Sequence, residues 1–222
     1  MNIEIVLFDG HDELDVLGPF EVFKMAEAAG ADLHVRRVTR ISQSIVTASH
    51  GTCYEPDGAY RLGADVVLVP GGGWIDRDRG VWRETQKGGW APLLQEAAWE
   101  GAVMTSVCTG ALLLAHAGII GTRPATTHRL AWDDLAATGA RVVKSRVVDD
   151  GNLVTSGGVT CGIDMALWLV ERGFGRRLAD GIAEGIEYRR FRPEGDVAQP
   201  ATTSSTDFTR PASRATSTSL YD

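Results

Sequence analysis

The sequence has few cysteines, and they lie far apart. Its 222 residues include three of them, Cys53, Cys108 and Cys161, and their spacing matches no zinc motif. An odd number of widely spaced cysteines does not predict a disulfide framework. No set of His, Cys and carboxylate positions predicts a metal site either. We therefore judge each cysteine from the residues around it.

Concentrated positive charge is also missing. The chain carries 22 Lys and Arg against 29 Asp and Glu, a formal net charge of -7, and its basic residues are scattered along the sequence. Proteins that bind nucleic acids gather basic residues into a patch or stripe. We therefore expect no nucleic-acid partner.

Long apolar runs are absent as well. The run at 111–115 is among the longest, and it is far shorter than the ~20 residues that a helix needs to span a bilayer. The opening segment, MNIEIVLFDG, lacks the basic region, apolar core and cleavage site of a secretory signal. We expect a cytoplasmic protein without a membrane segment.

The sequence does contain a regular alternation of strand and helix patterns. Short apolar runs predict buried strands over 3–8, 65–70 and 102–107, and an alternating pattern predicts a strand over 33–39. Apolar residues at helical spacing, with their start and stop signals, predict helices over 15–29, 90–100, 109–117, 129–138, 163–172 and 178–189. Two β-branched runs on either side of 149–152 predict a hairpin.

This order predicts one α/β domain over residues 1–190, built on a flavodoxin-like, doubly wound, mostly parallel sheet with helices on both faces. From 191 to 222 the composition shifts to Pro, Ser and Thr, so we expect a disordered tail there. Ligands of such folds bind beyond the carboxyl ends of the strands. The segments around Asp15, Gly72 and Cys108 each follow a predicted strand, which makes them the candidate site.

Cys108 is the most reactive candidate. It separates the strand pattern AVMTSV from the helix pattern TGALLLAHA, as nucleophiles do at the elbows of α/β hydrolases. The first amides of the helix stabilise negative charge, so we expect the thiol pKa to fall below its usual value of about 8.5. The alternative is an inert buried cysteine.

Several ordered motifs resemble the ThiJ/PfpI superfamily, which has the class I glutamine amidotransferase-like fold, and especially its isonitrile hydratase branch. They are SVCTGALLLAHAGII, GTRPATTHRLAWDDL and RVVDDGNLVTSGGVTCGIDMAL, together with the earlier LDVLGPFEVF and the PGG loop. The resemblance extends from Met1 to about Tyr188. It implies that Cys108 is the nucleophile and that the Asp15 carboxyl approaches its sulfur.

The resemblance also implies the state of this pair and the groups around it. Two like charges at hydrogen-bond distance repel, so either Asp15 or Cys108 holds a proton and the two titrate together; the alternative role for Asp15 is a helix N-cap. Gly72 and Gly73 would supply N–H donors to a developing negative charge, or form a simple turn. Thr109 would offer its N–H and hydroxyl to substrate or water, or pack in the first helical turn.

His128 is either a donor in the pocket wall or a helix-start residue with no chemical role. The protease branch of the superfamily places a histidine directly after the nucleophile, where this sequence has Thr109, so a Cys-His peptidase is not expected. Cys161 begins a predicted helix, and packing among small residues is its expected role. Cys53 lies in a predicted loop.

The resemblance favours hydration of an isonitrile, a small-molecule substrate, to an N-substituted formamide through a thioimidate on Cys108, with no cofactor and no metal. It also implies a homodimer. Two alternatives stay open: glyoxalase III-like or deglycase-like action on reactive carbonyls, and a non-catalytic sensor in which Cys108 is oxidised. The sequence shows no helix-turn-helix segment, which makes direct transcriptional control an unfavoured variant of the sensor.

Overall fold

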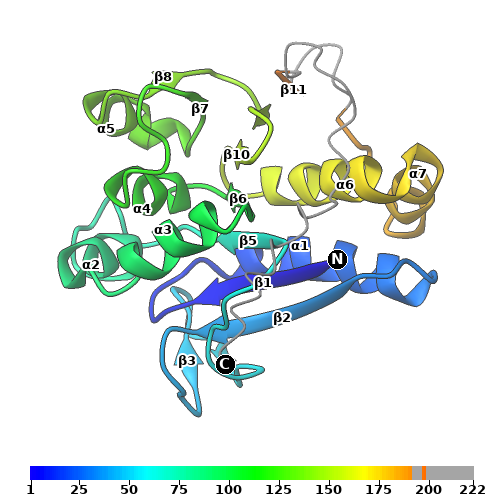
Figure 1. Cartoon of the computed structure of the whole chain (residues 1–222), viewed down its shortest axis with the longest axis horizontal. Coiled ribbons are helices and arrows are strands. Elements are labelled where there is room, and N and C mark those ends of the chain that lie inside the picture. The colour runs from blue at the N-terminus through cyan, green and yellow to red at the C-terminus, as the bar shows by residue number, and fades with distance from the viewer. Residues whose placement is uncertain (192–196, 199–222) are drawn as a thin grey trace, which may run out of the picture.

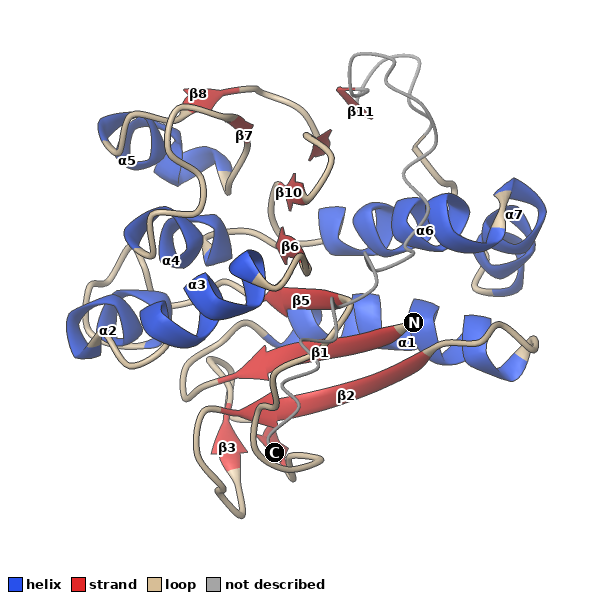
Figure 2. Ribbon diagram, in the orientation of Figure 1, coloured by secondary structure: helices blue, strands red, loops and turns tan. Residues whose placement is uncertain are grey.

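The computed structural model describes residues 1–191 and the backbone of residues 197–198. A seven-stranded sheet forms its centre, with helices on both faces (Figures 1 and 2). The strands of this sheet are β1 (Asn2–Leu7), β2 (His34–Thr39), β5 (Val66–Val69), β6 (Val103–Ser106), β9 (Val147–Asp149), β10 (Leu153–Ser156) and β11 (Val197–Ala198).

The spatial order of the strands is β11-β9-β10-β6-β5-β1-β2. Neighbouring strands from β2 to β10 are parallel, β9 is antiparallel to β10, and β11 is parallel to β9. Strands β5, β6 and β10 are buried along their whole length, because helices cover both sides of the sheet. The doubly wound, mostly parallel fold expected from the sequence is confirmed.

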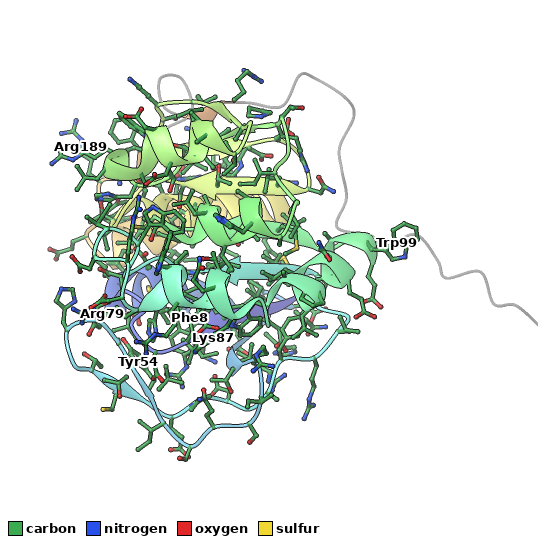
Figure 3. All side chains as sticks on the ribbon, turned by 90° about the vertical axis from the view of Figure 1, so that its left-hand side faces the viewer. Phe8, Tyr54, Arg79, Lys87, Trp99 and Arg189 are labelled. Carbon is green, nitrogen blue, oxygen red and sulfur yellow. The ribbon has the colours of Figure 1, made fainter. Side chains whose placement is uncertain are left out.

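The helices form two layers, each with its own hydrophobic core against the sheet. One layer contains α1 (Glu13–Ala28), α6 (Cys161–Phe174) and α7 (Arg176–Gly185). The other contains α2 (Gly80–Lys87), α3 (Ala91–Trp99), α4 (Gly110–His116) and α5 (Trp132–Ala137). Each helix buries part of its surface in one of these two cores, whereas Trp99 extends from the end of α3 into solvent and is 90% exposed (Figure 3).

Three elements differ from the sequence-based expectation. Helix α2 was not predicted, and neither were the small sheets of β3 (Val46–Thr47) with β4 (Cys53–Tyr54) and of β7 (Pro124–Ala125) with β8 (Arg141–Val142). Strands of two residues are too short to carry a readable apolar period. As a result Cys53 lies in strand β4 and not in a loop.

The expected tail over 191–222 falls mostly outside the described residues; within it, 197–198 form β11 beside β9. Among the helices that the structure describes, none combines the length and the apolar character that crossing a membrane requires.

A buried ion pair fastens α6 to the β9–β10 hairpin. The Asp149 carboxylate is 3.0 Å from Nη1 of Arg172 and accepts a hydrogen bond of 2.6 Å from Nε1 of Trp168. The Asp149 side chain is 1% exposed. The guanidinium of Arg172 and the indole N–H of Trp168 therefore replace the water that the carboxylate loses on burial. Because β10 leads directly into Gly157 and Gly158, this contact fixes the segment that borders the site described below.

We predict that Asp149→Ala lowers the free energy of unfolding by about 3 kcal/mol, because it removes the buried carboxylate that faces the largely buried Arg172 guanidinium. Urea unfolding followed by circular dichroism measures the change. Lys24→Ala is the control, since it removes only the exposed Lys24–Glu27 pair and should cost about 0.5 kcal/mol or less. Equal losses in the two variants would contradict the structural role given to Asp149.

Candidate active site

Cys108 occupies a strained turn between β6 and α4. Its φ is +56°, a left-handed conformation that is unusual for any residue except glycine. The Cys108 N–H donates to the carbonyl oxygens of Ser156 (3.1 Å) and Gly157 (3.0 Å), and the Thr127 hydroxyl donates to the Cys108 carbonyl at 2.8 Å. These contacts from neighbouring segments hold the turn in place.

Asp15 lies in the first turn of α1 and is fully buried. Its Oδ2 accepts a hydrogen bond of 2.9 Å from the N–H of Gly71. Its Oδ1 is also buried and has no nitrogen or oxygen partner at hydrogen-bond distance among the described residues. Asp12 is the N-cap of the helix, accepting from the N–H of Leu14, so the alternative reading of Asp15 as the cap is wrong.

Cys108 and Asp15 form an interacting buried pair. Burial raises the pKa of the Asp15 carboxyl well above its usual range, the Asp12 charge raises it further, and hydrogen bonds from Gly71 and from the Cys108 thiol oppose the shift. Burial and then the Asp15 charge raise the pKa of the Cys108 thiol. Both groups therefore resist ionisation, and the carboxyl and the thiol titrate as a coupled pair.

The expectation of a lowered thiol pKa is therefore wrong. The N–H and hydroxyl of Thr109 do donate to the sulfur and lower its pKa, as the helix start was expected to do. Their effect is smaller than those of burial and of the neighbouring carboxyl, because Cys108 is only 7% exposed. Sequence spacing alone does not give the degree of burial.

Thr109 is hydrogen-bonded to the glycine loop that follows β5. The N–H of Gly72 donates to Oγ1 of Thr109 at 3.0 Å, which leaves the hydroxyl proton of Thr109 to point toward the sulfur. A Cβ at Gly71 would lie 2.6 Å from the backbone nitrogen of Thr109, so only glycine allows this approach. The oxyanion-binding role expected for Gly72 stays a prediction, since its N–H already has an acceptor.

Gly73 lies against the residue that precedes α2. Its φ is +67°, and a Cβ there would lie 2.5 Å from the carbonyl oxygen of Arg79. The structure therefore assigns Gly73 to the closure of the loop against α2. Its expected role as an N–H donor to substrate stays a prediction.

His128 lies beside the sulfur and also starts a helical turn. Its Nδ1 accepts a hydrogen bond of 3.3 Å from the N–H of Leu130, which confirms the helix-start reading. Burial, and then the charge of Arg129, lower its pKa, so the ring is neutral at neutral pH. Because Nδ1 is the acceptor, the ring proton is on Nε2, and His128 can act as a neutral donor.

Gly158 lies next to both His128 and Cys108, and the sequence did not identify it as a site residue. A Cβ at this position would lie 2.4 Å from Cδ2 of His128 and 2.9 Å from Sγ of Cys108. The TSGGVTCG motif contained the signal, since paired glycines after a strand often mark a close approach. Cys161, at the start of α6, donates to the Gly158 carbonyl at 3.5 Å, in agreement with its expected packing among small residues.

Within the described part of the chain, no group of three His, Cys, Asp or Glu side chains is arranged to hold a metal ion. The side chains that the site brings together are a thiol beside a buried carboxyl, and neutral donors from Thr109 and His128.

Fold and site together define a class: doubly wound α/β proteins with a cysteine at a strained strand-to-helix turn and a buried carboxyl beside it. Within that class the chain belongs to the DJ-1/PfpI family, whose family model matches residues 1–172. This confirms the resemblance found in the sequence.

Individual relatives differ in their named roles. An isonitrile hydratase from Pseudomonas putida is 35% identical over 195 residues, which cover 87% of this chain and 81% of the relative. A helix-turn-helix transcriptional regulator from Pseudomonas aeruginosa is 32% identical over 203 residues, 88% of this chain but only 53% of the regulator. A deglycase from Thermococcus kodakarensis is 26% identical over 160 residues, 70% of this chain and 89% of the deglycase.

Solved structures agree with the fold. A ThiJ/PfpI family protein from Pseudomonas syringae is similar with a TM-score of 0.77 and 25% identity, over 87% of this chain and 77% of that one. DJ-1beta from Drosophila melanogaster is similar with a TM-score of 0.72 and 22% identity, over 84% of this chain and 97% of that one.

We predict that Asp15→Asn lowers the pKa of the Cys108 thiol, because the substitution removes the nearby negative charge that opposes a thiolate. Thiolate absorbance in the ultraviolet, measured against a Cys108→Ala reference across neutral and alkaline pH, reports the pKa. Asp133→Asn, which changes an exposed carboxylate, should leave the titration where it is. A higher thiol pKa in Asp15→Asn would show instead that Asp15 acts mainly as a proton donor that stabilises the thiolate.

Proposed function

We propose that the protein is a cysteine-dependent isonitrile hydratase, which converts an isonitrile and water into an N-substituted formamide. The observation that carries the proposal is the buried Asp15 carboxyl beside Cys108, because a carboxyl with a raised pKa can hold a proton next to the nucleophile in a buried site. The 35% identity to an isonitrile hydratase over most of both chains supports it.

The first half of the reaction uses the proton of the pair. The Cys108 sulfur bonds to the terminal carbon of R–N≡C while Asp15 holds the proton, and this proton then passes to the same carbon. The result is a thioimidate, R–N=CH–S–Cys108, with Asp15 ionised. The buried carboxylate then lacks a proton, and its raised pKa makes it a base.

The second half restores the pair. Asp15 takes a proton from water as the water oxygen bonds to the thioimidate carbon, and it passes that proton to the nitrogen. The adduct R–NH–CH(OH)–S–Cys108 then breaks its carbon–sulfur bond, and its hydroxyl proton returns to Asp15. The products are R–NH–CHO and the Cys108 thiolate beside a protonated Asp15, which is the starting state.

Thr109 and His128 are the neighbouring donors in this scheme. The Thr109 hydroxyl, oriented by the N–H of Gly72, stabilises the sulfur when it carries negative charge. Neutral His128 can donate from Nε2 to the nitrogen or oxygen of the reacting group. Neither residue has to change its charge during the cycle.

Action on reactive carbonyls is the second candidate, because the similarity to a deglycase extends over 70% of this chain. A carboxyl-assisted cysteine could attack a carbonyl carbon as it attacks an isonitrile carbon. Conversion of methylglyoxal to lactate without glutathione distinguishes this activity. A Cys108 that reacts with peroxide in a protein that turns over neither substrate would favour the sensor.

We predict that the wild-type protein removes the infrared band of cyclohexyl isonitrile and that Cys108→Ala abolishes this loss. Asp15→Ala should lower the rate by about 100-fold or more, because it removes the group that carries the proton. Cys53→Ala, at an exposed position in β4, is the matched control and should keep the full rate. If the wild-type protein leaves a panel of alkyl isonitriles intact, the hydratase proposal is wrong.

A further inference from the structure

A second feature of the site is a cavity of roughly 300 Å³ that Gly158 helps to line. Its lining residues come from the segment between β7 and α5, the first residue of α5, the segment between β8 and β9, and the chain from the end of β10 to the start of α6. The wall residues that matter for its chemistry are His128, Arg129, Trp132, Lys144, Arg146 and Gly158. The mechanism above gives a role to His128 alone among them.

The cavity shares a wall with the nucleophile. Gly158 and His128 both line it, and a Cβ on Gly158 would lie 2.9 Å from Sγ of Cys108 and 2.4 Å from the His128 ring. The missing side chain of Gly158 is thus what keeps the sulfur and the cavity next to each other. A group bonded to the sulfur has this cavity as its neighbouring space.

The charge of the cavity is opposite to that of the protein. Three cationic residues line it and no carboxylate does, although the chain has a net charge of -7. Arg146 is neutralised, because its Nε donates to Asp164 at 2.7 Å. Arg129 and Lys144 form no ion pair with any described carboxylate, so two positive charges are available to a ligand.

One side of the cavity is aromatic. Nζ of Lys144 lies 4.9 Å from the centroid of the Trp132 ring, so the cation is held over the indole face. Trp132 therefore offers an apolar surface directly beside a positive charge. A ligand that matches both features has an apolar body and an anionic group, and 300 Å³ is at the lower end of the range for small-molecule sites.

We propose that this cavity binds the substituent on the isonitrile nitrogen and selects substituents in which an apolar group carries a carboxylate. The inference rests on the proposed hydratase function for its reaction, and it adds the substrate class. The isonitrile carbon lies at Cys108, the substituent passes Gly158, its apolar group packs on Trp132, and its carboxylate pairs with Arg129 and Lys144.

The kinetic test compares 2-isocyano-3-phenylpropanoate with its uncharged methyl ester. The ratio of their kcat/KM values should favour the carboxylate by about tenfold, which corresponds to about 1.4 kcal/mol. In the double variant Arg129→Gln, Lys144→Gln this ratio should fall to about one, because charge pairing is lost. Arg141→Gln, which removes an exposed cation outside the cavity, is the control and should keep the ratio.

The binding test is independent of turnover. Calorimetry with Cys108→Ala should show that N-formylphenylalanine, the formamide product of the same acid, binds about tenfold more tightly than N-formylphenylalanine amide. Adding Arg129→Gln and Lys144→Gln should remove this difference. Equal affinities, no binding of the acid, or a preference that survives both substitutions would each overturn the cavity proposal.

The two proposals fail in different ways. Hydration of cyclohexyl isonitrile with no preference for the carboxylate would leave the hydratase standing and remove the anionic substrate class. Absence of any isonitrile hydration would remove the hydratase, and the calorimetric comparison would still decide whether the cavity takes a carboxylate.

Discussion

The site depends on one backbone constraint, the left-handed conformation of Cys108. A φ of +56° turns the chain sharply from β6 into α4 and keeps Cys108 buried at the end of the strand. The carbonyls of Ser156 and Gly157 and the hydroxyl of Thr127 stabilise this turn from two other segments. The nucleophile is therefore positioned by long-range contacts, and the strain is balanced outside the turn.

That position brings the sulfur against a carboxyl that is equally buried. In water the two groups would titrate independently, but here burial raises the pKa of both, and the Asp15 charge raises that of the Cys108 thiol further. A carboxyl with a raised pKa beside a nucleophile can hold a proton and later accept one, which suits a reaction that needs a proton at carbon and then a base for water. Around this centre the glycines at positions 71, 72 and 158 let backbone and side chains approach within a distance that any Cβ would prevent.

Much of the fold was predictable because strand and helix patterns alternate with clear boundaries along the chain. The turn at Cys108 followed from a strand pattern that meets a helix pattern without a linker, while the pairing of Asp15 with Cys108 came only from family resemblance. Burial was not predictable, and this made the expected direction of the Cys108 pKa wrong. The role of Gly158 and the cationic cavity were not predicted, because segments that lie far apart in the sequence form them.

The covalent thioimidate on Cys108 is the central claim, and intact-protein mass spectrometry of acid-quenched reactions tests it most directly. The account predicts a transient mass increase equal to the whole isonitrile, which peptide mapping assigns to Cys108 and which Cys108→Ala lacks. Consumption of isonitrile with no adduct at any time, or an adduct on Cys53 or Cys161 in its place, would contradict it.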